Sequence, residues 1–124
     1  MHELGIVIQI VKQLESYMLQ HEIEQIEVVV LQIGALSSIY PKYLEDVYPM
    51  AIESSKLKNT RLEIDVSPGI GKCTDCEFVY NLVENQNRCP RCASKSFSII
   101  SGKEFLIKQI VVDERKMGGK HVLL

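Results

Sequence analysis

The chain has 124 residues, 46% of them apolar, and its 14 basic and 16 acidic side chains give a net charge of −2. That length and composition suit one domain, or a small domain that carries a smaller insert. The charge balance argues against a polyanion as partner of the whole chain. No apolar run approaches the roughly 20 residues of a membrane-spanning helix. We therefore expect a cytoplasmic protein that binds neither nucleic acid nor a membrane.

The first third of the chain predicts one helix and one strand. Residues 4–20 carry apolar side chains at helical spacing, namely Leu4, Val7, Val11, Leu14 and Met18. The run from Ile26 to Ile33 is apolar on both faces after Glu27, which is typical of an interior strand, and Gly34 ends it.

A second helix is predicted to open at Pro41, with Ser37 and Ser38 as candidate caps. One side of it carries the apolar residues, and Pro49 lies inside it and should kink it. Lys56–Thr60 then forms a polar turn, and residues 61–66 alternate as in a half-buried strand. Strand, helix and strand in this order indicate a right-handed crossover with parallel strands.

All four cysteines fall in two tight pairs, Cys73-Thr-Asp-Cys76 and Cys89-Pro-Arg-Cys92. Two such knuckles can surround one ion tetrahedrally, and zinc favours four thiolates. The segment between them has few apolar residues, so metal binding would supply much of its folding free energy. We interpret Cys73, Cys76, Cys89 and Cys92 as ligands of a structural Zn(II).

Other interpretations of the cysteines are a redox dithiol, a rubredoxin-like iron site and disulfides. A redox dithiol needs one pair beside a thioredoxin-like unit, not two matched pairs. Iron takes the same four-sulfur geometry and remains the main rival. Disulfides suit secreted chains, and nothing at the amino terminus resembles a signal peptide.

The carboxyl-terminal part returns to the first domain. Residues 105–112 form a strong strand, and the tail 113–124 is charged and Gly-rich, so it is a candidate for disorder. The predicted fold class is α+β: a small mixed three-stranded sheet with two helices, plus an inserted four-cysteine knuckle domain. The predicted domains are residues 1–68 with 103–112, residues 69–102, and the tail. Flexible joints at Pro68–Gly71 and Ser101–Gly102 would permit strand exchange in a homodimer.

The amino terminus, Met1-His2-Glu3, offers nitrogen ligands. The α-amine, the amides of His2 and Glu3 and the His2 imidazole could enclose an ion in a plane, which Ni(II) and Cu(II) accept and zinc does not prefer. The Glu3 carboxylate could approach as a further ligand. A histidine at position two is otherwise a solvated terminal residue.

In combination, these features resemble the HypA/HybF hydrogenase-maturation nickel metallochaperones. The resemblance rests on Met1-His2-Glu3-Leu4, the long helix, the strand ending at Ile33-Gly34, the cysteine pairs and Ser101–Ile107, and it covers residues 1–112. It implies that Met1, His2 and Glu3 carry Ni(II) as transient cargo and that Cys73, Cys76, Cys89 and Cys92 carry Zn(II).

The resemblance also implies partners and a function. The cargo would go to the NiFe-hydrogenase large subunit with a maturation GTPase of the HypB type, and in some organisms to urease through its accessory proteins. The chain would be a transfer protein and not an enzyme, and it has no phosphate loop of its own. The loop 36–40 offers no further nickel ligand, and His21 and His121 are assigned no role. The alternative function is a zinc-ribbon interaction module for nucleic acid or a protein complex.

Overall fold

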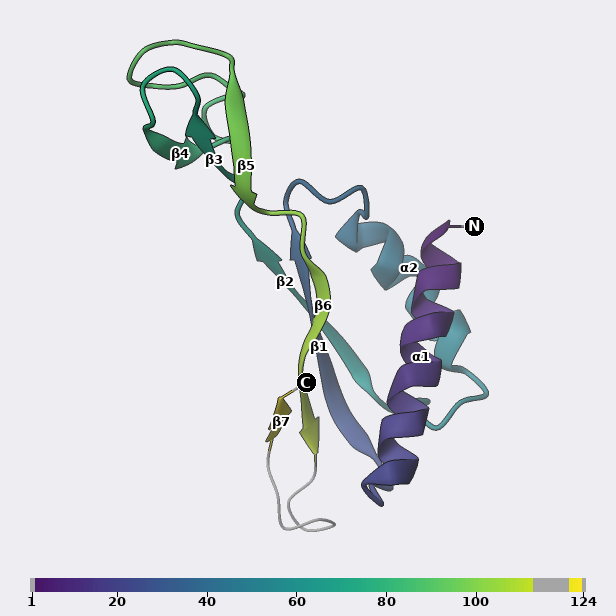
Figure 1. The fold of residues 1–124 in the computed structure, drawn as a ribbon. Helices are drawn as coiled ribbons and strands as arrows, with labels where there is room; N and C mark the ends of the chain where they lie inside the picture. Colours follow the sequence, from purple (N-terminus) through teal and green to yellow (C-terminus); the bar gives the residue numbers. More distant parts are fainter. Residues whose placement is uncertain (1, 113–120, 124) are drawn as a thin grey trace. The chain divides into compact units, whose positions relative to one another are not determined.

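The structure is a computed structural model that describes the backbone of residues 2–112 and 121–123. Helices and strands alternate first, and strands alone follow (Figure 1). The helices are α1 (His2–Gln20) and α2 (Pro41–Ile52), and the strands are β1 (Ile26–Gly34), β2 (Arg61–Ser67), β3 (Ile70–Cys73), β4 (Val79–Asn81), β5 (Phe97–Ser101), β6 (Phe105–Val112) and β7 (His121–Leu123). No helix among the described residues is long and apolar enough to cross a membrane.

The helix α1 buries the face that its apolar spacing predicts. Val7, Leu14 and Met18 are at most 2% exposed, and α1 packs against α2. The helix begins at His2, earlier than the predicted Leu4. The N–H groups of the first turn have no partner within the helix. This turn can therefore consist of residues that precede the apolar pattern, and the pattern does not locate it.

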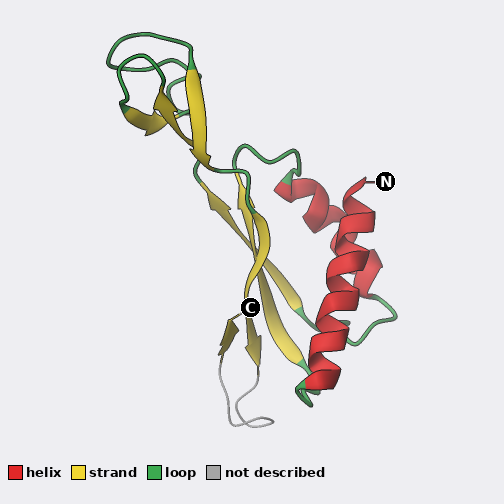
Figure 2. Cartoon of the chain, in the orientation of Figure 1, coloured by secondary structure: helices red, strands yellow, loops and turns green. Residues whose placement is uncertain are grey.

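One sheet has the strand order β2-β1-β6-β7. Figure 1 shows β1 and β2 running in the same direction and β6 in the opposite one, so the predicted mixed sheet of three strands is confirmed. Both helices lie on one side of it (Figure 2). The fourth strand, β7, pairs antiparallel with β6 and was not predicted. The expectation of disorder covered residues 113–124, and of these only β7 lies within the described residues.

The segment around α2 differs from expectation in its details. Pro41 does open the helix, but Tyr40 is the N-cap residue and makes no side-chain capping bond, so the prediction of serine caps is wrong. The turn after α2 was expected to be polar, but it buries two of its side chains, because Leu57 and Thr60 are only 0% and 3% exposed. The Thr60 hydroxyl donates to the Ile26 carbonyl at 2.6 Å, which ties this turn to the start of β1.

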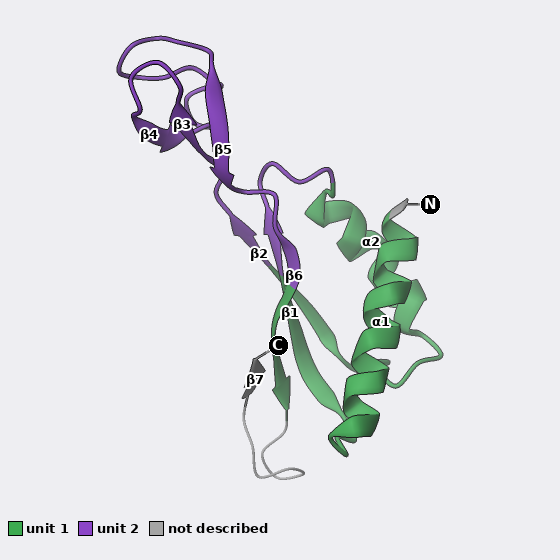
Figure 3. Ribbon diagram, viewed as in Figure 1, with its two compact units in different colours: residues 1–31, 39–64, 107–124 green, residues 32–38, 65–106 purple. Residues whose placement is uncertain are grey.

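The remaining strands form a second, smaller sheet with the order β4-β3-β5, antiparallel throughout. The chain makes two compact units (Figure 3). The second unit comprises Gln32–Ser38 and Asp65–Leu106, and the other described residues make up the first unit. The unit boundary therefore falls inside β1, β2 and β6. Whether residues 69–102 fold as a separate domain stays a prediction.

Candidate metal centre

The two cysteine pairs lie on two turns with the same backbone hydrogen bonds. In the first turn the Cys73 N–H donates to the Phe78 carbonyl at 2.9 Å, and the Glu77 N–H donates to the Cys73 carbonyl at 2.9 Å. The second turn repeats both bonds, at 2.9 and 2.8 Å, with Cys89, Ser94 and Ala93 in the corresponding places. The two knuckles expected from the sequence are thus present and nearly equivalent.

Each knuckle contains one residue with a left-handed backbone. Glu77 and Ala93 directly follow the second cysteine of their pair, and each has φ of 66°. A side chain at positive φ brings Cβ close to the carbonyl oxygen, so glycine is the usual residue in this conformation. These two positions were not predicted from the sequence, because neither residue is glycine. Their place after each Cys-x-x-Cys was the signal available.

The four sulfur atoms converge on one point. The ligand atoms of all four cysteines lie within 4.8 Å of one another. The Sγ–Sγ distance is 3.5 Å for Cys73 and Cys92 and 3.6 Å for Cys76 and Cys89. Zinc–sulfur bonds of about 2.3 Å in a tetrahedron place sulfurs roughly 3.8 Å apart, whereas a disulfide needs about 2.05 Å. All four cysteines are free, so the disulfide alternative is wrong and the cluster is consistent with zinc.

Backbone N–H groups point at the sulfurs. The Cys76 N–H lies 3.5 Å from the Cys73 Sγ, and the Arg91 N–H lies 3.4 Å from the Cys89 Sγ. The Cys76 N–H stabilises the thiolate and lowers the pKa of Cys73 to about 7. The Ser94 N–H acts in the same sense on Cys92, but the neighbouring sulfurs and burial outweigh it and raise the pKa of Cys92 to about 12. Four crowded sulfurs ionise together only when a cation neutralises them.

A small core lies beneath the sulfurs. Cys73, Cys89, Tyr80 and Leu82 are buried together, and Leu36 and Phe97 pack against them. The Tyr80 hydroxyl is buried without a hydrogen-bond partner among the described residues. Burial, and then the charges of the nearby cysteines, raise the pKa of Tyr80, so its hydroxyl stays a donor. A donor next to thiolates fits an anionic four-sulfur site.

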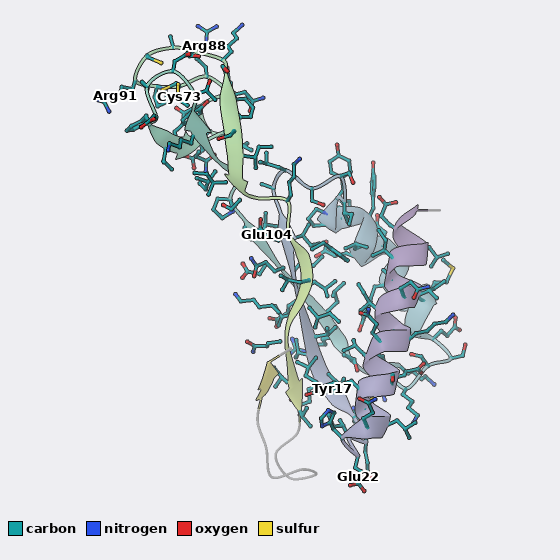
Figure 4. All side chains as sticks on the ribbon, in the orientation of Figure 1. Tyr17, Glu22, Cys73, Arg88, Arg91 and Glu104 are labelled. Atoms are coloured by element: carbon teal, nitrogen blue, oxygen red, sulfur yellow. The ribbon has the colours of Figure 1, made fainter. Side chains whose placement is uncertain are left out.

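Side chains between and after the ligands link the two knuckles. The Thr74 hydroxyl donates to the Ser96 hydroxyl at 2.6 Å, and the Ser94 hydroxyl donates to the Asp75 carboxylate. On the outside, the Arg91 guanidinium lies 5.9 Å from the centre of the Phe78 ring, and Figure 4 shows Arg91 pointing away from the cluster. Cys92 is exposed, whereas Cys73 and Cys89 are buried, so one corner of the site faces solvent.

The residues expected to carry nickel lie mostly outside the described side chains. Met1 lies outside the described residues, and for His2 only the backbone is described. Glu3 is half-buried in the first turn of α1. A nickel site at Met1, His2 and Glu3 therefore stays a prediction, and only its backbone setting is known. Among the described side chains, the four cysteines are the one group arranged to hold a metal ion.

The other histidines stay outside any site. His21 is exposed directly after α1, and its ring centre lies 4.1 Å from that of Tyr17. Histidine beside an aromatic ring at a helix end is adequately explained by stacking. For His121 only the backbone is described, as part of β7.

Comparisons with known proteins agree on one family. Residues 1–112 match the family described as hydrogenase/urease nickel incorporation, metallochaperone, hypA. A hydrogenase maturation factor HypA of Chlorobium luteolum is 34% identical over 92% of this chain and 97% of its own length. That of Parabacteroides distasonis is 35% identical over 90% and 97%.

Two solved structures share the fold. The solution structure of the Ni metallochaperone HypA from Helicobacter pylori superimposes with a TM-score of 0.61 at 23% identity, over 89% of this chain and 96% of that one. A second solution structure of HypA protein gives 0.65 at 24% identity, over 90% and 96%. The resemblance found in the sequence is thereby confirmed. The chain belongs to the HypA family of nickel metallochaperones for hydrogenase maturation, which are not enzymes.

Proposed function

We propose that this chain binds Ni(II) at Met1, His2 and Glu3 and releases it to a partner in hydrogenase maturation. The observation that carries the proposal is the start of α1 at His2. The first four N–H groups of a helix have no partner within the helix. The amides of His2 and Glu3 can therefore give up their protons to a metal without breaking a helical hydrogen bond.

The helical backbone also suits chelation. A metal held by two successive backbone nitrogens closes a five-membered ring, which requires both nitrogens on the same side of the Cα–C bond. A helical ψ near −42° approaches that arrangement, whereas an extended ψ near +135° separates the nitrogens. The His2 backbone is helical, so its amide and that of Glu3 can lie in one plane with the Met1 α-amine, and the His2 imidazole is then a further ligand outside this set of three nitrogens. Planar nitrogen coordination is favourable for Ni(II).

The four-cysteine cluster has a different role in the proposal. Cys73, Cys76, Cys89 and Cys92 hold a zinc ion, which neutralises the thiolates and stabilises the second unit. A site with four protein ligands leaves no position for cargo, whereas a chain terminus exchanges ligands readily. Iron at the same cysteines is the alternative. Elemental analysis decides between them, and iron would also give visible absorption.

The transfer step is ligand exchange. A partner offers new ligands to nickel while the amides and α-amine of the terminus take protons back, so N–H bonds re-form and no other covalent bond of the protein changes. We propose a GTPase of the HypB type and the NiFe-hydrogenase large subunit as partners, with urease accessory proteins as a second route. A homodimer and a cytoplasmic location also stay predictions.

Nickel binding by two histidine variants tests the proposal. His2→Ala and His21→Ala each remove one imidazole from opposite ends of α1, so His21→Ala is a matched control. With the cysteines loaded with zinc, calorimetry should show His2→Ala losing at least about tenfold in nickel affinity, which is ~1.4 kcal/mol. His21→Ala should bind like the parent protein. Equal affinity in both variants would favour the zinc-ribbon interaction module, for which the terminus is incidental.

A further inference from the structure

The strand β5 (Phe97–Ser101) lies at an edge of the second unit's sheet. Ser98 pairs with Lys72 of β3, and the Ser96 carbonyl accepts from the Thr74 N–H at 3.1 Å. Ser96 and Ser98 thus direct their backbone groups towards β3. Because these groups alternate in direction along an antiparallel strand, Phe97 and Ile99 direct theirs towards the open edge.

The open edge has few of the features that keep edge strands apart. Phe97–Ser101 contains neither proline nor a charged residue, and Ile99 and Ile100 are 41% and 55% exposed. Edge strands with apolar, uncharged residues readily pair with another strand. One protective feature is present, a register shift that leaves Ile100 without a partner in β3. This bulge restricts straight pairing to the part of β5 before Ile100.

Positive charges flank this edge. Lys95 precedes β5 and Lys103 follows it, and both are exposed. Lys72 is the partner of Ser98 in register, so its exposed side chain lies on the same face of the sheet as the side chain of Ser98. None of the three forms an ion pair among the described residues. The adjacent carboxylate of Glu104 accepts hydrogen bonds from Ser67 and Gly102 instead of pairing with Lys103.

We propose that β5 is a docking edge for an extended segment of another protein, with an apolar centre and carboxylates at its ends. The segment adds to the sheet as a strand beside β5 and hydrogen-bonds to the backbone of Phe97 and Ile99. Its carboxylates meet Lys95 and Lys103, and its apolar side chains cover Ile99. This surface shares no residue with the proposed nickel site, so either proposal can fail without the other.

A second copy of this chain is a poorer occupant. In the antiparallel register that pairs Ile99 with Ile99 of a second copy, Lys95 of each copy approaches Lys103 of the other beyond the bulge, and like charges on adjacent strands repel. A segment with acidic ends replaces both repulsions with attractions. The charges thus discriminate between partners that the backbone alone would accept equally.

Peptide binding to the full-length, zinc-loaded protein tests the docking edge. The probe is an alternating Thr–Val peptide with glutamate at each end, and the controls are the same peptide with lysine ends and an acidic peptide with proline at alternate positions. The acidic strand-forming peptide should bind at least tenfold more tightly than either control. Its binding should shift the NMR amide signals of Phe97 and Ile99 and slow their hydrogen exchange.

Two variants make the test specific. Ile99→Pro removes an N–H that points to the open edge, and proline is tolerated in edge strands at such places; Ile99→Thr keeps the N–H as its control. The proline variant should lose peptide binding, and the threonine variant should retain it. If Ile99→Pro fails to bind zinc, the Lys95→Glu, Lys103→Glu double variant replaces it and should prefer the lysine-ended peptide.

The outcomes divide clearly. Preference for the acidic peptide, and its inversion in the double variant, support the proposal. Equal binding of acidic and lysine-ended peptides, or of the proline-containing peptide, would overturn it, as would no binding at all. Sedimentation that reveals a dimer in the parent protein and a monomer in Ile99→Pro would assign the edge to a second copy, which also contradicts the proposal.

Discussion

The carbonyl oxygen of Gly102 lies 1.9 Å from the point where a Cβ on Gly34 would be. The end of β1 thus runs against the connection between β5 and β6, with no space for a side chain. Hydrogen bonds hold this contact, because the Leu36 N–H donates to the Gly102 carbonyl at 2.7 Å and the Ala35 N–H donates to the Ser67 carbonyl at 2.8 Å. The joint expected to be flexible around Gly102 is a packed and hydrogen-bonded crossing of three chain segments.

Gly34→Ala should destabilise the protein strongly. The added methyl meets backbone atoms, which cannot move aside as a side chain does, and overpacking of this kind costs about 1–3 kcal/mol or more. Chemical denaturation of the zinc-loaded protein measures the change. Gly5→Ala is the control, because nothing lies within 4 Å of its added Cβ. In α1 this substitution should stabilise by roughly 0.5–1 kcal/mol. Equal effects of the two substitutions would contradict the close crossing.

Glu104 adds a pH-dependent element to this crossing. The Ser67 hydroxyl donates to its carboxylate at 2.7 Å and the Gly102 N–H donates to the other oxygen, and these bonds lower the pKa of Glu104 below the ordinary 4.5. A lowered carboxyl pKa stabilises the folded state above the unfolded pKa, and this contribution disappears as the pH falls through the folded pKa.

Glu104→Gln should therefore destabilise the protein at pH 7, because the amide NH₂ group would meet another donor. The difference in free energy of unfolding between this variant and the parent protein should shrink as the pH falls below about 4.5. Urea denaturation from pH 7 to pH 3 measures this difference. The exposed Glu27→Gln serves as the control. A Glu104→Gln deficit that stays constant over this range would show that the carboxylate charge is not the cause.

The sequence predicts the parts of this molecule that periodicity and ligand spacing determine. The buried face of α1, the mixed sheet and the meeting of Cys73, Cys76, Cys89 and Cys92 follow from local pattern. It does not predict the burial of Leu57 or Thr60, because a polar-looking turn is buried only through contacts distant in sequence. The crossing at Gly34 is missed for the same reason. The strand β7 has too few residues to show a period.

Cys92→Ala should unfold much of the second unit through loss of metal. Cys92 is exposed, whereas Cys73 is buried in the small core. The exposed position removes a ligand with little loss of packing, so the effect reports on metal binding. A structural zinc site contributes on the order of 10–16 kcal/mol of binding free energy. Zinc content and NMR amide dispersion measure the result, and signals of residues 26–31 should survive. Their collapse together with the knuckle signals would contradict modular stability of the two units.

Ala93→Gly should stabilise the zinc-loaded protein. Ala93 has φ of 66°, which strains an alanine and not a glycine. Relief of this strain should outweigh the greater conformational entropy that glycine gives the unfolded chain. The free energy of unfolding should rise by about 1 kcal/mol. The melting temperature at saturating zinc measures it. Ala51→Gly, in α2, is the control and should lower the melting temperature by a similar free energy. A destabilising Ala93→Gly would contradict the knuckle geometry.

The nickel affinity of a protein with three glycines added ahead of Met1, which moves the new α-amine too far from His2 to share a chelate with it, tests the central proposal most directly. The extension turns the α-amine of Met1 into an amide and leaves every side chain in place. The parent protein, with Met1 verified as its first residue by mass spectrometry, and the extended protein are titrated with nickel by calorimetry, with zinc already loaded. We predict a yellow, diamagnetic nickel complex for the parent and an affinity at least about tenfold lower for the extended protein. Equal affinities would contradict a nickel site built on the amino terminus.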